Sequence, residues 1–591
     1  MSRTNGDCGV APPIRVPRPL SHQTEFPGRA TPPLNQETLL FDPAQPQAGA
    51  LRTVLAFPST YSVGITSLGY QVVWATLAQR ADVDVRRLFT DQADPPHRQG
   101  DRRSDRQLGS GGSGLDLFGL SLSWELDGPV LLDLLEQQRI PIWAEQRGEA
   151  DPIVFGGGPV LTANPEPLAP FFDVLLLGDG ELLLPAFIDA ISAHRDAPRQ
   201  QRLRALAQVP GVYVPALYAP RYGSEGELLA IEPIEAGIPA SVAKQTWRGN
   251  TLSHSTVITP EAAWPSIHMV EVVRSCPELC RFCLASYLTL PFRTSSLEDG
   301  LIPAVEKGLA ATQRLGLLGA SVTQHPQFAD LLSWLDQDRF DGTRVSVSSV
   351  RAATVTPQLG QILAKRGSKS LTIAIESGSE RMREVVNKKL STEEIFAAAR
   401  YAKEGGLSGL KLYGMAGLPT ETEADVEATA ELMLALKKAT PGLRLSLGVS
   451  TFVPKAHTPF QWQGVRPEAE KRLKLLSKRL QPKGIELRPE SYGWSVIQAL
   501  LSRSDRRLAP VIAAARGDHA SLGGWKKAYR AVVEGATGGT PAGVSPLPVP
   551  PPWQEVVHGD WSSDRVLPWE HLDGPLPKAT LVGHRQQALA G

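Results

Sequence analysis

Cys276-Pro277-Glu278-Leu279-Cys280-Arg281-Phe282-Cys283 contains three of the four cysteines in a chain of 591 residues. Thiolates at the spacing C-x3-C-x2-C can converge on one metal centre. A structural zinc ion needs four protein ligands, but Cys8 lies far away and the nearest histidine, His268, is eight residues upstream of Cys276. Cysteine thiolates also hold cubane iron–sulfur clusters, and three of them leave one iron open to a substrate or cofactor. The pattern favours a reactive iron–sulfur site; a structural zinc and an incidental group of cysteines are the alternatives.

The octapeptide resembles the C-x3-C-x-aromatic-C signature of the radical S-adenosylmethionine (SAM) superfamily. The resemblance implies a 4Fe-4S cluster held by Cys276, Cys280 and Cys283, whose open iron binds the amino and carboxylate groups of SAM. It also implies that SAM is cleaved reductively to a 5′-deoxyadenosyl radical, with the difficult chemistry residing in the cofactors. Phe282 matches the aromatic position that packs near the adenine.

Composition limits the class of protein. A chain of 591 residues is expected to hold about three to four domains. Lysine plus arginine and aspartate plus glutamate both number 61, so no net basic field points to nucleic acid. Four cysteines are too few for a disulfide framework. The N-terminus has no apolar run typical of a signal peptide, and no stretch reaches the length of a membrane helix. We therefore expect a reduced, cytoplasmic compartment and no membrane partner.

Residues 1–48 are rich in proline, glycine and polar residues and are predicted to be a disordered leader. Residues 49–195 are predicted to form one domain. Five apolar runs alternate there with helical patterns, at residues 51–58, 83–89, 115–123, 153–155 and 174–177. This alternation predicts an α/β fold with a Rossmann-like, doubly wound parallel sheet that binds ligands at the carboxyl ends of its strands. Residues 196–265 are mixed in character and are predicted to be a bridge.

Residues 49–195 resemble the cobalamin-binding-like domain that precedes the barrel in many radical SAM proteins. Ser121, Gly156 and Gly157 lie where the nucleotide-contacting serine and glycine turn of that fold lie. Domains that ligate cobalt through histidine carry D-x-H-x-x-G, whereas residues 94–100 read D-P-P-H-R-Q-G, with one extra residue. We interpret His97 as a solvated loop histidine. Cobalamin bound without a histidine ligand, and a sheet that now grips the substrate, are both open.

Residues 266–465 are predicted to form a partial (β/α)6 TIM-type barrel, like the barrel of radical SAM enzymes. Six apolar runs are separated by helical patterns, at residues 269–273, 314–321, 344–350, 370–375, 409–413 and 443–452. The first run leads directly into the cysteine stretch. Catalytic groups are expected on the loops at the carboxyl ends of the strands. Residues 466–591 are predicted to be a small, mainly helical extension.

The resemblance implies contacts to SAM after two of these runs. Gly319 and Ser321 lie where the Gly-Gly-Glu turn of the superfamily binds the amino group of SAM, with serine in place of glutamate. Gly414 and Gly417 match the glycine-rich turn whose backbone approaches the adenine, which glycine permits because it lacks a side chain.

Glu376 and Ser377 end the fourth run, where a polar side chain of the superfamily often holds the ribose hydroxyls. A carboxylate can accept hydrogen bonds from both hydroxyls. The alternative is a helix N-cap formed by Ser377 or Ser379, and the two roles are compatible.

The loop at residues 454–462 reads P-K-A-H-T-P-F-Q-W and resembles V-P-K-x-H-T-P-F-Q-W in one group of uncharacterised radical SAM proteins. Its two prolines fix the shape of the loop. We hypothesise that Lys455, His457 and Gln461 face the barrel mouth and contact substrate, with Lys455 and His457 as the catalytic candidates. A rigid loop that closes the barrel is the alternative.

These features together predict a radical SAM iron–sulfur enzyme acting on an unknown substrate, with an electron donor such as flavodoxin or ferredoxin as its partner. If cobalamin binds, the favoured reaction is methyl transfer to an unactivated carbon. If it does not, the enzyme is expected to abstract hydrogen for a rearrangement, an oxidation or a group insertion. A methylthiotransferase fits less well because the chain lacks cysteines for a second cluster. The alternative class is a non-catalytic iron–sulfur binding, electron-transfer or assembly protein, and consumption of SAM distinguishes the two.

Overall fold

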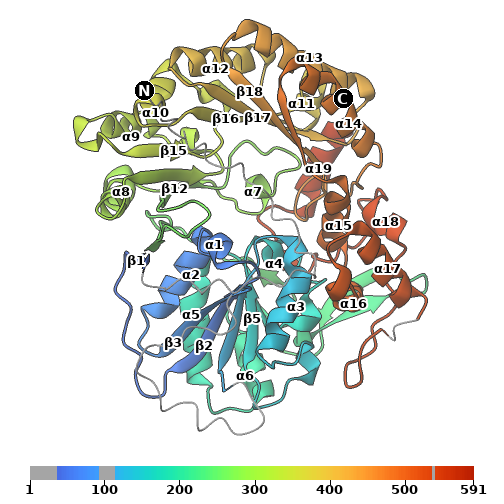
Figure 1. Cartoon of the computed structure of the whole chain (residues 1–591). Helices are drawn as coiled ribbons and strands as arrows, with labels where there is room; N and C mark the ends of the chain where they lie inside the picture. Colours follow the sequence, from blue (N-terminus) through green and yellow to red (C-terminus); the bar gives the residue numbers. More distant parts are fainter. Residues whose placement is uncertain (1–35, 92–113, 536–538, 591) are drawn as a thin grey trace, which may run out of the picture.

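A six-stranded sheet forms the centre of the N-terminal part of the chain (Figure 1). The computed structural model describes residues 36–91, 114–535 and 539–590. In pairing order the strands of this sheet are β3 (Val83–Phe89), β2 (Leu51–Phe57), β4 (Leu117–Ser121), β5 (Ile153–Gly157), β6 (Val174–Leu176) and β7 (Val212–Tyr213). Neighbouring strands are parallel except β6 and β7. This is the flavodoxin-like doubly wound order, so the predicted Rossmann-like sheet is confirmed.

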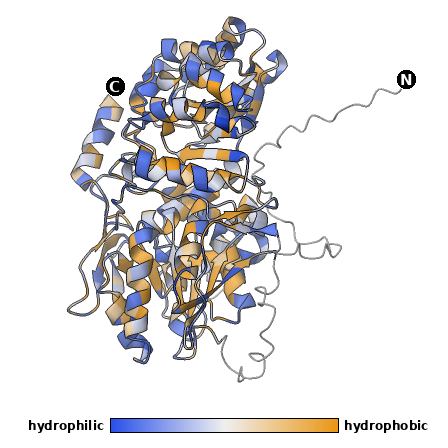
Figure 2. Cartoon of the chain, turned by 90° about the vertical axis from the view of Figure 1, so that its left-hand side faces the viewer, coloured by the Kyte–Doolittle hydropathy of each residue, from blue (hydrophilic) through white to orange (hydrophobic). Residues whose placement is uncertain are grey.

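The central strands of this sheet are buried on both faces. In β4 the residues from Leu117 to Leu120 are all buried, as expected for parallel strands covered by helices. Figure 2 shows hydrophobic residues concentrated along these strands. The helices of this part are α1 (Tyr61–Gly64), α2 (Leu68–Ala78), α3 (Gly128–Gln137), α4 (Pro159–Ala163), α5 (Gly180–Ala193) and α6 (Arg199–Leu206). Within the described residues, no helix is long and apolar enough to cross a membrane.

Short strands tie distant segments to this domain. They are the antiparallel pair β1 (Thr38–Leu39) and β11 (Val257–Ile258), the hairpin β8 (Tyr218–Tyr222) and β9 (Leu228–Pro233), and the parallel pair β10 (Val242–Ala243) and β20 (Leu572–Asp573). β1 lies inside segment 1–48, so residues 38–39 of the predicted leader form a strand. Likewise β7 joins the sheet although it lies in the predicted bridge. The short strands β1 and β10 are recognisable only through their partners, so the sequence does not reveal them. The domain boundaries themselves stay a prediction.

A second set of strands, parallel except for the short β13 (Arg293–Thr294), forms the partial barrel (Figure 1). It consists of two sheets, β13-β12-β14-β15 and β16-β17-β18-β19, joined by a parallel bridge between Val350 and Ile373. The strands are β12 (His268–Arg274), β13 (Arg293–Thr294), β14 (Arg314–Gly319), β15 (Arg344–Val347), β16 (Ser370–Glu376), β17 (Gly409–Ala416), β18 (Arg444–Thr451) and β19 (Glu486–Pro489). The six predicted strands are therefore confirmed. The structure adds two strands that were not predicted: β13, within the barrel, and β19, within the segment predicted to be mainly helical.

Helices pack outside the barrel strands and continue into the C-terminal region. Those between the strands are α7 (Leu284–Tyr287), α8 (Ile302–Leu309), α9 (Phe328–Leu335), α10 (Pro357–Lys365), α11 (Glu380–Val385), α12 (Thr392–Glu404), α13 (Glu423–Ala439) and α14 (Ala469–Leu480). The C-terminal helices are α15 (Tyr492–Arg503), α16 (Ala509–Ala515), α17 (Leu522–Val533), α18 (Trp553–Val557) and α19 (Lys578–Ala590). The predicted helical extension is thus present, and Figure 1 shows α15 to α17 running down beside the N-terminal domain.

Charged side chains join the N-terminal sheet to the barrel where β6 and β12 end. Asp179, which follows β6, accepts a hydrogen bond from Arg293 Nη1 at 2.5 Å and pairs with Arg274 Nη1 at 3.2 Å. Arg274, the last residue of β12, also pairs with Glu181 at 2.8 Å and with Glu271 at 2.7 Å. Burial alone would raise the pKa of Asp179, but the neighbouring arginines lower it below its usual range. This ionic joint therefore anchors the strand that delivers the cysteines.

A buried ion pair fastens the C-terminal helices to the N-terminal domain. Arg506 Nε donates to Glu166 Oε2 at 2.8 Å, and the hydroxyl of Tyr213 donates to Glu166 Oε1 at 2.6 Å. His571 Nε2 lies 3.5 Å from the same carboxylate. Glu166 is fully buried. Burial would raise its pKa, but the positive charge of Arg506 and the hydrogen bonds from Arg506 and Tyr213 outweigh burial and lower it. Arg506 and His571 thus have a structural role: both contact Glu166 and attach the C-terminal region to the N-terminal domain.

Replacing Arg506 by methionine should leave the carboxylate of Glu166 buried without its cation. We expect a loss of about 3–5 kcal/mol in the free energy of unfolding, measured as a lower midpoint temperature in scanning calorimetry. Arg204→Met is the matched control, because Arg204 pairs with Glu235 at the surface, where ion pairs contribute little. An Arg506→Met protein that melts with the wild type would show that this ion pair contributes nothing to stability.

Candidate active site

The cysteine loop begins where β12 ends and finishes at α7. Ser275 and Leu279 have positive φ angles of 73° and 54°, a left-handed conformation that is unfavourable for these residue types. Cys280 is buried, whereas Cys276 and Cys283 are partly exposed. The amide of Cys283 donates to the carbonyl of Cys280 at 2.8 Å, and Cys283 is the N-cap residue of α7. A tight, strained turn thus presents all three thiols at the carboxyl end of a barrel strand.

The chemistry of this donor set fits a cluster better than a single ion. Among the described residues, no three His, Cys, Asp or Glu side chains lie close enough together to hold one metal ion, as a zinc site requires. A cubane takes its thiolates at separate irons. Burial raises the pKa of the Cys280 thiol to about 12 and also raises the pKa of Cys283. The thiols of Cys280 and Cys283 therefore need a strong local positive charge to ionise, and bound iron supplies one.

The turn after β14 contacts the cysteine loop through Gln324. Gln324 Nε2 donates to Glu278 Oε1 at 2.5 Å, and its Oε1 accepts from the hydroxyl of Ser321 and lies 4.0 Å from Cys276 Sγ. Ser321 is thus close to the thiols, at the position predicted to bind the amino group of SAM. Gly319 has φ 154°, and a Cβ there would lie 2.7 Å from the carbonyl oxygen of Val273. Sequence reasoning missed Gln324; its amide three residues beyond the glycine turn was the available signal.

Glu376 lies at the end of β16, next to the thiols. Its carboxylate accepts from Lys388 Nζ at 2.8 Å, and both side chains are largely buried. Burial alone would lower the pKa of Lys388, but the negative charge of Glu376 raises it above its usual range. Ser377 Oγ instead accepts from the amide of Ser379 at 3.2 Å, and Ser379 Oγ caps α11. The N-cap is therefore Ser379 rather than Ser377, and ribose binding by Glu376 and Ser377 stays a prediction.

Phe282 and the turn after β17 meet at one apolar cluster. Phe282 and Met415 pack against the same group, namely Met382, Val385, Val386, Leu418, Phe452, Phe460 and Ala588. A Cβ on Gly414 would lie 3.0 Å from the carbonyl oxygen of Glu376, and one on Gly417 would lie 2.8 Å from Cβ of Ala469. Gly417, at φ 82°, is thus needed for packing of α14. Phe282 therefore shares a cluster with Met415, the neighbour of Gly414 in the chain. Contact of Phe282, Gly414 and Gly417 with adenine stays a prediction.

Ser121 and Gly157 lie side by side at the carboxyl ends of β4 and β5. A Cβ on Gly157 would have its nearest neighbour at 3.7 Å, whereas one on Gly156 would lie 2.5 Å from the ring of Phe172. Gly156 is therefore a core residue, and Ser121 and Gly157 form the more open edge. His97 lies outside the described residues. Cobalamin contact by Ser121, Gly156 and Gly157 stays a prediction.

The loop after β18 reaches across to the N-terminal domain. Lys455 Nζ forms an ion pair with Glu125, which also accepts from Gln498 Nε2 at 2.8 Å. His457 Nε2 lies 3.1 Å from the carbonyl oxygen of Ala163, and its amide donates to Gln461 Oε1 at 2.8 Å. Lys455 and His457 thus face the interface between the sheets and have protein partners there. These partners favour the rigid-loop role, and contact with substrate stays a prediction. Sequence reasoning missed Glu125 because no local pattern pairs it with Lys455.

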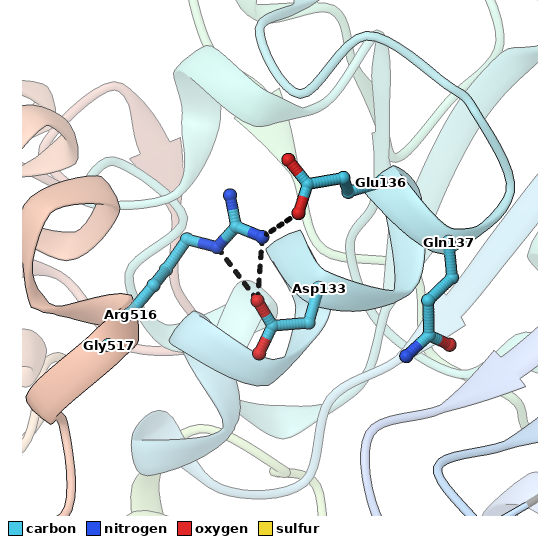
Figure 3. Close-up of a pocket in the computed structure, with 5 residues that line it drawn as sticks. All are labelled: Asp133, Glu136, Gln137, Arg516 and Gly517. Carbon is cyan, nitrogen blue, oxygen red and sulfur yellow. Dashed lines mark hydrogen bonds and ion pairs between the residues drawn. The ribbon is translucent and has the colours of Figure 1, made fainter. Parts of the chain in front are cut away.

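A separate pocket of about 480 Å³ is lined by Asp133, Glu136, Gln137, Arg516 and Gly517. Figure 3 shows the guanidinium of Arg516 between the two carboxylates, at 2.7 Å from Asp133 and 2.6 Å from Glu136. These ion pairs join α3 to the turn after α16. The pocket contains none of the predicted site residues, so we assign it a structural role.

Acid should weaken the interface at His457. Burial lowers the pKa of His457 from 6.5 to about 4. The folded-state pKa lies below the unfolded value, so the stability contributed by the neutral imidazole is complete above pH 6.5 and is lost as the pH falls toward 4. The slope is about 1.4 kcal/mol per pH unit for one group. His457→Gln should therefore reduce the fall in calorimetric midpoint across this range, and His194→Gln should not. Identical pH profiles for His457→Gln and the wild type would contradict this.

Comparison with known proteins identifies the family. The model described as radical SAM proteins, N-terminal, matches residues 69–215, and the radical SAM superfamily model matches residues 270–433. An uncharacterised protein of Methanocaldococcus jannaschii is 27% identical over 457 residues, which cover 77% of this chain and 89% of that protein. An uncharacterised methyltransferase of Pyrococcus horikoshii is 25% identical over 296 residues, which cover 46% of this chain and 56% of that protein.

Two solved structures are similar in fold. The radical SAM methyltransferase TsrM from Kitasatospora setae, with cobalamin and a 4Fe-4S cluster bound, is 16% identical with a TM-score of 0.47, over 71% of this chain and 76% of TsrM. The cobalamin-dependent SAM radical enzyme OxsB is 14% identical with a TM-score of 0.43, over 65% of this chain and 52% of OxsB. The family models, together with the cysteine loop at the end of β12, show that the chain belongs to the radical SAM superfamily and is a radical SAM enzyme with an additional N-terminal parallel-sheet domain.

Proposed function

We propose that the protein binds a 4Fe-4S cluster through Cys276, Cys280 and Cys283 and cleaves SAM reductively to generate a 5′-deoxyadenosyl radical. When bound, the cluster supplies the electron for this cleavage. The observation that carries the proposal is the set of three thiols at the spacing C-x3-C-x2-C, in the loop that begins at the carboxyl end of β12. Membership in an enzyme family favours this proposal over a non-catalytic assembly or electron-transfer protein.

The surrounding residues suit the proposed site. Phe282 and Met415 supply an apolar wall beside the cysteine loop. Glu376 supplies a buried carboxylate, held by Lys388, that can accept hydrogen bonds from ribose hydroxyls. Gln324 and Ser321 supply polar groups beside Cys276. The residues thus provide an apolar side for a base and polar sides for a sugar and an amino acid, which SAM combines.

We propose methyl transfer assisted by cobalamin as the finer function. Lys455 and His457, in the loop after β18, contact Glu125 after β4 and Ala163 at the end of α4, which follows β5. The carboxyl ends of β4 and β5 therefore lie next to the barrel loops. In doubly wound sheets, ligands bind at this edge, at the point where the strand order reverses. That point lies between β2 and β4. The relative in Pyrococcus horikoshii is named a methyltransferase, which supports the same reaction. The reductant, flavodoxin or ferredoxin, is also a proposal.

The products of SAM test both levels of the proposal. Anaerobically reconstituted, reduced protein should convert SAM to 5′-deoxyadenosine, measured by mass spectrometry. Added cobalamin should in addition yield S-adenosylhomocysteine, the product of methyl transfer from SAM. If 5′-deoxyadenosine forms but S-adenosylhomocysteine does not, the methyl-transfer proposal fails and hydrogen abstraction is supported. Absence of both products would argue for a non-catalytic cluster.

Removing any one thiol should prevent cluster assembly. Cys276→Ala, Cys280→Ala and Cys283→Ala should each lose the brown chromophore and the bound iron, because an incomplete set of thiolates cannot hold the cubane. Iron and sulfide analysis of the reconstituted proteins checks this. Cys8→Ala is the matched control and should load normally. A Cys8→Ala protein that alone lost its iron would refute the ligand assignment.

A further inference from the structure

The segment 384–389, which consists of the last two residues of α11 and the four residues after it, runs alongside the cysteine loop and is called the strap here. The amide of Arg281, in the middle of the loop, donates to the carbonyl of Val386 at 3.0 Å. Arg281 Nη1 donates to the carbonyl oxygens of Glu384 at 2.9 Å and Val385 at 2.8 Å. A guanidinium at the C-terminus of a helix satisfies carbonyls that have no partner within the helix. The loop therefore caps α11, and the strap is fixed to the loop.

Asn387 makes the reverse contact, from the strap to the loop. Its Nδ2 donates to the carbonyl oxygens of Glu278 at 3.1 Å and Leu279 at 2.9 Å. These two residues lie between Cys276 and Cys280. Leu279 has a φ of 54°, and a strained residue keeps such a conformation only where its surroundings enforce it. The carboxamide of Asn387 supplies part of that enforcement.

Asn387 is itself suited to this position by its backbone. Its φ is 55°, in the left-handed region that asparagine tolerates better than most residues. The next two residues of the strap also form ion pairs. Lys389 Nζ lies 3.8 Å from Glu278 in the cysteine loop, and Lys388 pairs at 2.8 Å with Glu376 at the end of β16. Arg351, which lies in the loop after β15, also binds the cysteine loop, because its Nη1 pairs with the carboxylate of Glu278 at 2.5 Å. The middle of the cysteine loop is thus held by side chains from separate barrel loops.

We infer that Asn387 is a positioning residue that sets the conformation of the cysteine loop, and hence how firmly the three thiols hold the cluster. The inference rests on the proposed cluster at Cys276, Cys280 and Cys283. Asn387 acts through the loop backbone and touches none of the thiols. Residues that orient metal ligands from outside the coordination sphere commonly change metal affinity about 10–100-fold when they are replaced.

Two substitutions separate the hydrogen bonds of Asn387 from its backbone geometry. Asn387→Asp keeps the shape but places a carboxylate oxygen against two carbonyl oxygens. Asn387→Gly accommodates the positive φ and removes the donor. Glu384→Gln is the matched control, because Glu384 lies on the same strap, is exposed, and contacts the loop only through its carbonyl.

All four proteins, including the wild type, are reconstituted with ferrous iron and sulfide. We then measure the rate at which an iron chelator removes the cluster, the electron paramagnetic resonance spectrum of the reduced cluster, and the midpoint temperature of the cluster-free chain. Both Asn387 variants should lose iron roughly tenfold faster than the wild type and show an altered spectrum. The Glu384→Gln protein should match the wild type in both.

The spectrum and the chelation rate decide the result, whatever happens to the midpoint temperature. Wild-type values in both Asn387 variants would overturn the inference, including the case in which their cluster-free chains melt earlier, because that pattern indicates a purely structural role. Failure of the proposed cluster looks different: the wild type itself would then bind no stoichiometric iron and sulfide.

Discussion

The contact of Asp179 with Arg274 and Arg293 fixes the end of β12 against the end of β6. Its charges are mostly removed from water, with the side chain of Arg293 only 8% exposed. Breaking one partner of such a pair leaves a buried charge without compensation, which costs far more than the pair gains over apolar packing. The cysteine stretch starts two residues after Arg274. The position of the thiols relative to the N-terminal domain therefore depends on this joint.

Other charged contacts orient the same two sheets. Lys455 with Glu125 crosses from the barrel loops to the loop after β4, and Arg506 with Glu166 attaches the C-terminal helices to the N-terminal domain. The carboxyl ends of both parallel sheets consequently face one another. Ligand-binding loops gather at such ends in open sheets and in barrels alike, so a substrate or second cofactor between the sheets is within reach of loops from both.

The cysteine loop shows how a reactive site stores strain that the rest of the fold supports. Ser275 and Leu279 adopt left-handed backbone conformations, which their side chains disfavour. Gln324, Arg351 and Asn387 reach the loop from three separate barrel loops and bind its polar groups. None of these side chains is a thiol ligand. Their common role is to hold Glu278 and the neighbouring carbonyls, which leaves the cysteines free to bind metal.

The sequence by itself determined the elements and the chemistry that local patterns encode. The spacing of Cys276, Cys280 and Cys283 specified the candidate cluster site. Alternating apolar runs specified the doubly wound sheet and six barrel strands, β12 and β14 to β18. Tertiary structure decided which polar side chains serve the site. Gln324, Asn387 and Glu125 carry no motif, because their importance comes from partners 46 to 330 residues away. It also decided that Ser379 rather than Ser377 caps α11, and that β1 and β19 exist. A hydrogen bond between distant residues leaves no periodic trace in the chain, whereas burial of a helix or strand does.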